Sequence, residues 1–343
     1  MTTSQALAQL QAEPRVLKAL LAQSSVAEPH LRVIPSFKRY GYRWHPIGRH
    51  IYAAPERGTF HEFLFFLLSK RFGHEWLKRE MGMSPMMRHP VARWNSEIGT
   101  RIFEAAGENF RCDASGEPAA LLQLSYDLFC LQAADSLPDS FTSRLLAHDT
   151  FQSARYEIAA AAVMARAGFR LSWLEPSHRA ASCEFLATCR RTGITVAVEA
   201  RSRRRPGAMA ESGTFLFRPS AEAIQNLIRR AVRKRTLTLP FLVFLDLNLP
   251  GVPNAVPELK LWWQETAGAV AKFVDKNPAP LSALVLTNYS PHYGKVVASG
   301  ETGIVGEWGF ILPTRPEPPV LPAPLAQAIY ESLGRYNQVP AEI

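Results

Sequence analysis

The chain has few cysteines and no long hydrophobic run, and both shortages narrow what it can be. Its four cysteines, at positions 112, 130, 183 and 189, include no CxxC pair, so we expect neither a zinc site nor a disulfide framework. The longest apolar runs, such as 63–68 and 241–247, are too short to span a bilayer. The first residues hold no apolar segment of the signal-peptide kind. The sequence therefore predicts reduced thiols, no membrane partner and a cytoplasmic protein.

Several motifs with a known chemistry are also missing. We find no internal repeat, no phosphate-binding Walker loop, no dinucleotide fingerprint and no Ser/His/Asp signature. A hydrophobic fraction of 47% with 20% charged residues is typical of a globular chain. Its 343 residues are enough for two domains with cores of their own.

Three glutamates in the stretch 151–206 form the most informative pattern. Apolar residues at helical spacing predict a helix over 151–167, which carries Glu157, and Gly168 is a natural stop. Short runs with strand-like alternation follow, and Glu184 and Glu199 lie on two of them. Because side chains along a strand alternate between faces, Glu199 and Arg201 share one face.

This arrangement suits a divalent-metal centre. We expect Glu184 to meet Glu199 across a pair of neighbouring strands, with Glu157 supplied by the preceding helix. Hard cations such as Mg²⁺ take oxygen ligands and keep several waters, so two or three carboxylates with an open side are sufficient. The alternative is that Glu157 is a solvated residue on a helix face, and that Glu184 and Glu199 pair with Arg201 or Arg190 in weak surface salt bridges.

The order of these residues resembles the PD-(D/E)XK nuclease superfamily over roughly 151–289. Glu157 matches the helix acid, Glu184-Phe185 the acid with an aromatic neighbour, and Glu199-Ala200-Arg201 the Glu-X-Lys motif. The resemblance implies a restriction-endonuclease-like α-β-β-β-α-β core and Mg²⁺- or Mn²⁺-dependent cleavage of phosphodiesters in DNA or RNA. It also implies catalytic roles for these three glutamates and Arg201, with the glutamates as metal ligands.

Arg201 departs from the family pattern, which has lysine at this position. An arginine stays protonated and cannot act as a base, although it can stabilise negative charge on a phosphorane. This leaves an alternative function open: a catalytically weak or inactive nuclease-fold module that binds nucleic acid or a protein partner.

Positive charge is concentrated just after the third glutamate. The segment 201–235 holds ten basic residues against two acidic ones, an excess of eight, within a chain whose net charge is +9. Such a patch can hold a phosphate backbone, and nucleic acid is the expected partner. The alternative is the solvated end of a helix, where cations are favoured by the dipole. The expected contact residues are Arg201, Arg203, Arg204, Arg205, Arg229, Arg230 and Arg233.

The predicted fold class is α/β, a mixed sheet flanked by helices, preceded by a mainly helical domain. We place the helical domain at 1–140, the nuclease-like domain at 141–312, and a Pro-rich tail with a short helix at 313–343. The segment 31–50 has five Lys/Arg, two His and four aromatic residues but no acid. It is either a gripping surface for single strands or a strand with its aromatics on one face; the alternation favours the strand.

Overall fold

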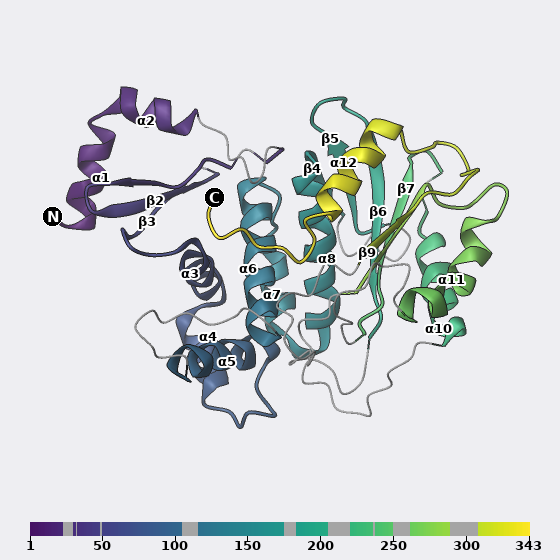
Figure 1. Ribbon diagram of the computed structural model, residues 1–343, viewed down its shortest axis with the longest axis horizontal. Helices are drawn as coiled ribbons and strands as arrows, with labels where there is room; N and C mark the ends of the chain where they lie inside the picture. Colours follow the sequence, from purple (N-terminus) through teal and green to yellow (C-terminus); the bar gives the residue numbers. More distant parts are fainter. Residues whose placement is uncertain are drawn as a thin grey trace.

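A computed structural model describes residues 1–22, 30–31, 33–48, 50–104, 116–174, 183–204, 220–235, 237–249, 261–288 and 308–343. They form a three-stranded antiparallel sheet and a six-stranded mixed sheet, with helices packed around both (Figure 1). The expected α/β class with a mixed, helix-flanked sheet is confirmed at this level.

The N-terminal part is a small sheet with two helices packed against it. These elements are α1 (Thr3–Gln11), α2 (Pro14–Leu21), β1 (Phe37–Arg39), β2 (Tyr42–Ile47) and β3 (His50–Pro55). Trp44 lies in a hydrophobic cluster with Ala6 and Leu10 of α1, and its side chain is buried. Tyr42 and Trp44 therefore lie on one face of β2, whereas Tyr40 lies in the turn before it, and Trp44 is not available to stack on a base.

A helical layer connects this sheet to the larger one. It contains α3 (Phe60–Phe72), α4 (His74–Met81), α5 (Pro90–Glu104), α6 (Glu117–Ala133) and α7 (Ser140–Leu146). Helix α3 begins with a capping box, in which Thr59 and Glu62 satisfy each other's backbone N–H groups. Helix α6 is buried along most of its length because α3, α5 and α8 all pack against it.

The larger sheet has the order β4-β5-β6-β7-β8-β9. Its strands are β4 (Phe169–Trp173), β5 (Phe185–Cys189), β6 (Thr195–Ser202), β7 (Phe241–Asp246), β8 (Ala283–Thr287) and β9 (Trp308–Ile311). Strands β6, β7 and β8 are parallel, and every other neighbouring pair is antiparallel. Gly193, at φ 73°, gives the turn between β5 and β6 a left-handed backbone that glycine adopts without strain.

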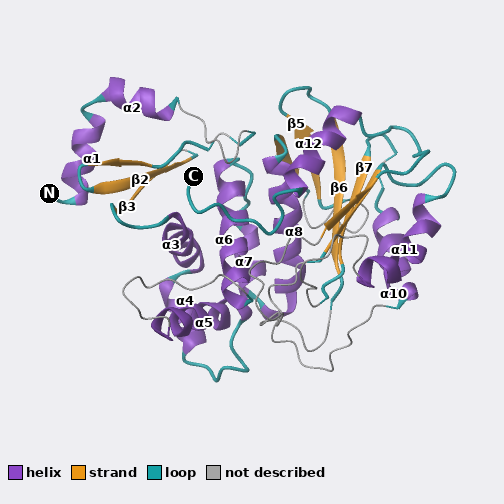
Figure 2. Cartoon of the chain, viewed as in Figure 1, coloured by secondary structure: helices purple, strands orange, loops and turns teal. Residues whose placement is uncertain are grey.

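Helices cover both faces of this sheet, as Figure 2 shows. The helices are α8 (His148–Arg166) and α12 (Ala323–Leu333) on one side, and α10 (Ala221–Val232) and α11 (Leu261–Val274) on the other. On β6, Val196 and Val198 pack in the cluster that contains α8, whereas Ala197 packs in the cluster that contains α10. This alternation decides on which face each functional side chain lies.

Starting at α8, the described elements run α8, β4, β5, β6, α10, β7, which is an α-β-β-β-α-β order. The helices and strands expected between 151 and 288 are present, with ends shifted by a few residues. Strand β9 and helix α7 were not expected from the sequence.

One hydrophobic cluster extends from Leu31 to Tyr336 and joins the helical layer to the larger sheet. It crosses both predicted domain boundaries, since Leu325, Ile329 and Leu333 of α12 belong to it as well. The three-part division of the chain remains a prediction. Across the described ranges, no helix has the length and apolar character needed to cross a bilayer.

Candidate functional site

Glu199 lies near the middle of the larger sheet with its side chain 0% exposed. Its odd position on β6 directs it to the same face as Ala197, toward α10, as the strand period requires. Neither carboxylate oxygen accepts a hydrogen bond of normal geometry from a residue that the structure describes. A buried carboxylate in this condition is costly unless cations lie close to it.

Glu184 stands directly beside it. Phe185 pairs with Val198 across the antiparallel strands, and the backbone N–H of Glu184 donates to the carbonyl oxygen of Val198 at 3.0 Å. This bond holds Glu184 against β6 at Val198, the residue that precedes Glu199. The structure thus brings these two glutamates together across the strand pair.

A lysine that we did not assign to the site lies between the two acids. The Nζ atom of Lys234 is 3.4 Å from Oε1 of Glu184 and 3.4 Å from Oε1 of Glu199. Lys234 follows α10 in the chain, more than thirty residues beyond Glu199. The sequence offered one signal for it: Lys234 is the single lysine among the ten basic residues of 201–235.

Arg201 is the second cation at Glu199. Its Nη2 atom lies 2.5 Å from Oε1 of Glu199, and its side chain is 30% exposed. Burial raises the pKa of Glu199 to about 7; the charges of Arg201 and Lys234 oppose this rise, and the neighbouring Glu184 adds to it. The carboxyl group of Glu199 is therefore close to a protonation change at neutral pH.

Glu157 does not join this pair directly. It lies on α8, which packs on the opposite face of the sheet. Arg144 of α7 donates two hydrogen bonds to it, from Nη1 to Oε2 and from Nη2 to Oε1, each 2.6 Å long. The charge of Glu184 also acts on Arg144. Both glutamates raise the pKa of Arg144, and the effect of Glu157 is the larger. Among the described residues, no three acidic, histidine or cysteine side chains are grouped to hold a metal ion.

The turn that carries Lys234 is held from outside by the Pro-rich segment 315–319. Arg235 forms an ion pair with Glu317 and donates from Nη2 to the carbonyl oxygen of Pro318 at 3.3 Å. The same segment is fixed to the sheet, since Ser282 donates its hydroxyl to the carbonyl oxygen of Pro319 at 3.1 Å. We refer to 315–319 as the strap.

A buried polar network on the other face fixes α8 to the ends of the parallel strands. Arg155 of α8 lies 3.0 Å from Asp246 of β7, and both side chains are buried. Ser202 donates to the same Asp246 oxygen at 3.1 Å, and Thr287 of β8 donates to Tyr156 at 2.8 Å. The network joins β6, β7 and β8 to the helix that carries Glu157, and sequence reasoning did not identify it.

The expected nucleic-acid contacts separate into two groups. Arg203 and Arg204 follow the carboxyl end of β6, whereas the exposed Arg229, Arg230 and Arg233 lie at the carboxyl end of α10. Because β6 and β7 are parallel neighbours, α10 must run back toward the start of β6, so the two groups point to different ends of the sheet. Arg205 lies outside the described residues.

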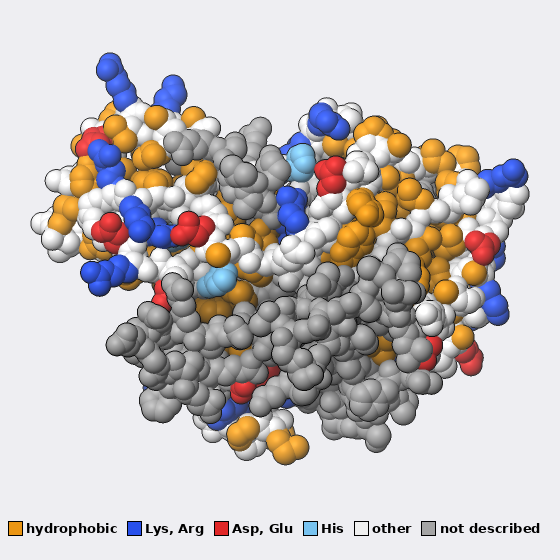
Figure 3. All heavy atoms as spheres, viewed as in Figure 1, with side chains coloured by type: hydrophobic (Ala, Val, Ile, Leu, Met, Phe, Trp, Pro, Cys, Tyr) orange, Lys and Arg blue, Asp and Glu red, His pale blue; other side chains and the backbone are white. Residues whose placement is uncertain are grey.

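Positive charge also occurs elsewhere on the surface. Figure 3 shows Lys and Arg side chains over the N-terminal helices and the small sheet, with acidic side chains among them. Arg15 and Lys18 of α2 are exposed there. The net charge of the protein is therefore not confined to the segment 201–235.

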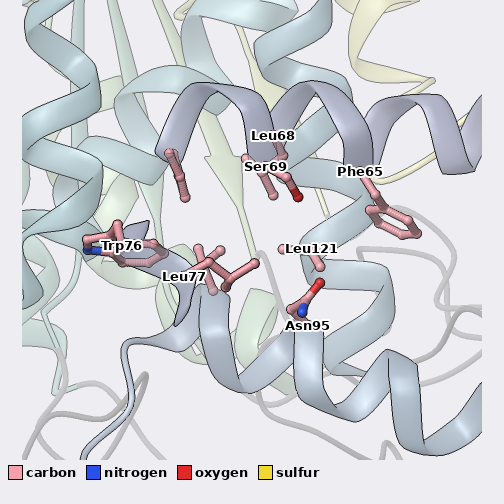
Figure 4. A pocket seen from close by; sticks show the side chains of 9 residues that line it. Phe65, Leu68, Ser69, Trp76, Leu77, Asn95 and Leu121 are labelled. Atoms are coloured by element: carbon pink, nitrogen blue, oxygen red, sulfur yellow. The ribbon is translucent and has the colours of Figure 1, made fainter. Parts of the chain in front are cut away.

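Neither of the two best-defined cavities among the described residues lies at the acids. One, lined by Leu68, Trp76 and Leu121 in the helical layer (Figure 4), holds about 10 Å³, room for no more than a single water. The other is an open groove of about 580 Å³ between α12 and the β5–β6 turn, bordered by Arg190 and Arg191.

Comparison with known proteins gives no match to any protein-family model, any curated protein or any solved structure. The chemistry of the site must therefore be judged from its own atoms. Two adjacent buried carboxylates, of which that of Glu199 accepts no hydrogen bond of normal geometry from the described residues, provide the oxygen donors that Mg²⁺ or Mn²⁺ requires. These residues fit such an ion.

Proposed function

We propose that this protein is a metal-dependent hydrolase of nucleic-acid phosphodiesters, built on a PD-(D/E)XK-like core. One observation carries the proposal: Glu184 and Glu199 lie side by side, with a lysine ammonium 3.4 Å from each. The α-β-β-β-α-β order of the described elements from α8 to β7 supports the same proposal.

The residues have distinct roles in this proposal. Glu184 and Glu199 would hold Mg²⁺ or Mn²⁺, an ion that polarises a phosphoryl oxygen and favours deprotonation of water when bound. Lys234 supplies the small ammonium group that Arg201 cannot provide, and it orients the attacking water. Arg201, partly exposed at the rim, donates hydrogen bonds to the phosphate.

The test is a plasmid-nicking assay with Mg²⁺ or Mn²⁺. We expect Lys234→Met to lower the cleavage rate by about 100-fold or more, the usual contribution of a positioned proton-transfer group. Lys272→Met is the matched control, because it removes an exposed lysine of α11 that is not among the expected nucleic-acid contacts; its rate should stay near that of the wild type. A Lys234→Met rate equal to wild type, or no metal-dependent cleavage at all, contradicts the proposal.

A second candidate function is a nuclease-fold module that binds nucleic acid or a partner without cleaving. It is favoured by the ion pairs that three cations already make with the three glutamates: Arg144 with Glu157, Arg201 with Glu199, and Lys234 with Glu184 and Glu199. A thermal-shift titration with Mn²⁺ separates the two, because an ion that binds only the folded state raises the melting temperature. If the protein is a hydrolase, Mn²⁺ should raise the melting temperature of the wild type but not that of Glu199→Gln. If it is a module that does not cleave, Mn²⁺ should leave the melting temperature of both unchanged.

A further inference from the structure

Arg144 holds Glu157 in a geometry that a phosphate can replace. Its two terminal nitrogens each donate to a different oxygen of the carboxylate, the fork-to-fork arrangement that guanidinium also makes with phosphate. The Arg144 side chain is 27% exposed, whereas that of Glu157 is 7% exposed. A ligand from solvent can therefore reach the arginine before it reaches the glutamate.

Arg144 is held so that its guanidinium faces the acids. The guanidinium lies over the ring of Phe141, 4.8 Å from the ring centre, and Thr150 of α8 donates its hydroxyl to the backbone carbonyl oxygen of Arg144 at 2.7 Å. Glu157 and Glu184 both raise the pKa of Arg144. Arg144 thus contacts Glu157 and lies close enough to Glu184 for the two charges to interact.

The charges of the cluster balance before any ion binds. In the described part of the chain each of the three carboxylates pairs with a cation, so a divalent ion beside Glu184 adds positive charge and repels the guanidinium nearby. A phosphodiester brings a negative charge and a pair of oxygens that fit the fork.

We propose that Arg144 is the receptor for the substrate phosphate, which takes the place of Glu157 at the guanidinium group. The inference rests on the proposed hydrolase function. It requires metal and phosphodiester to bind cooperatively, since each removes a cost that opposes the other. Arg144 is a binding residue in this scheme, and the Arg144–Glu157 pair is the resting state of the site.

The experiment is calorimetric titration of Mn²⁺ into the full-length protein, with and without a phosphorothioate-linked thymidine dinucleotide, which resists cleavage. In the wild type we expect the dinucleotide to tighten Mn²⁺ binding by about tenfold, within the usual range of coupling between two sites. An uncharged methylphosphonate dinucleotide should have no effect. Arg144→Gln should bind Mn²⁺ more tightly than wild type without the dinucleotide, and gain nothing from it.

Arg144→Lys is a second variant in case Arg144→Gln does not fold. It keeps a positive charge opposite Glu157 but loses the two-nitrogen contact of the guanidinium, so it should also lose the coupling between Mn²⁺ and the dinucleotide. If wild type and Arg144 variants bind Mn²⁺ equally with and without the dinucleotide, the role of Arg144 is overturned while the metal site stands. If wild type binds no Mn²⁺ even with the dinucleotide present, the proposed function itself fails, and this inference fails with it.

Discussion

Glu199 carries an ionisable group at a fully buried position, and this has a consequence for stability. Its pKa is raised by burial from the ordinary 4.5 to about 7. Between these values the folded protein binds a proton more tightly than the unfolded chain, so the free energy of unfolding falls as pH rises through this window and is level above it. Glu199→Gln should remove this fall and be more stable than wild type at pH 8 by about 2 to 3 kcal/mol. Urea unfolding at pH 5, 6, 7 and 8 measures this, and a wild-type slope retained in the variant would refute it.

Among the elements, the strap sets the position of the turn that carries Lys234. Glu317→Gln removes the ion pair between the strap and Arg235. Because Glu317 is partly exposed, we expect the free energy of unfolding to fall by less than about 1 kcal/mol. The side-chain NMR signal of Lys234 should nevertheless shift, because the lysine then moves relative to Glu184 and Glu199. Lys234→Arg assigns the signal by its disappearance. Glu331→Gln, an exposed change on α12, is the control and should leave the signal in place; an equal shift in both variants contradicts this role for the strap.

For the whole molecule, a net charge of +9 favours an anionic partner, and the two arginine groups can be tested separately. We expect binding to a labelled DNA duplex to weaken with salt. Replacing Arg203 and Arg204 by Ala, or the α10 group Arg229, Arg230 and Arg233 by Ala, should reduce the slope of log K against log salt by about 0.9 for each phosphate that the variant no longer neutralises. Fluorescence anisotropy over a KCl series measures the slope. Arg15→Ala with Lys18→Ala, on the exposed surface of α2, is the control; an equal reduction there would show that binding follows overall charge alone.

The sequence by itself was sufficient to predict the local pattern of strands in the larger sheet and the two strand glutamates of the site. Strand alternation predicts that Glu199 and Arg201 share a face, and that Glu184 meets Glu199 across a strand pair, because the two-residue period is a property of the backbone. The helix over 148–166 and the strands from β4 to β8 follow from equally local signals, namely apolar spacing, Gly168 and the Arg-Arg-Thr-Gly turn.

Only the tertiary structure decided which charges meet. Lys234 reaches the acids because α10 returns along the sheet, Arg144 reaches Glu157 because α7 packs beside α8, and the strap joins residues more than eighty positions apart. The same packing holds Glu157 apart from the other two glutamates. Local periodicity fixes the face on which a side chain lies, but its partner across the fold depends on how helices pack and on burial, which strengthens some ion pairs and excludes others. For this reason the sequence identified the two strand acids, and the structure was needed to find their cations.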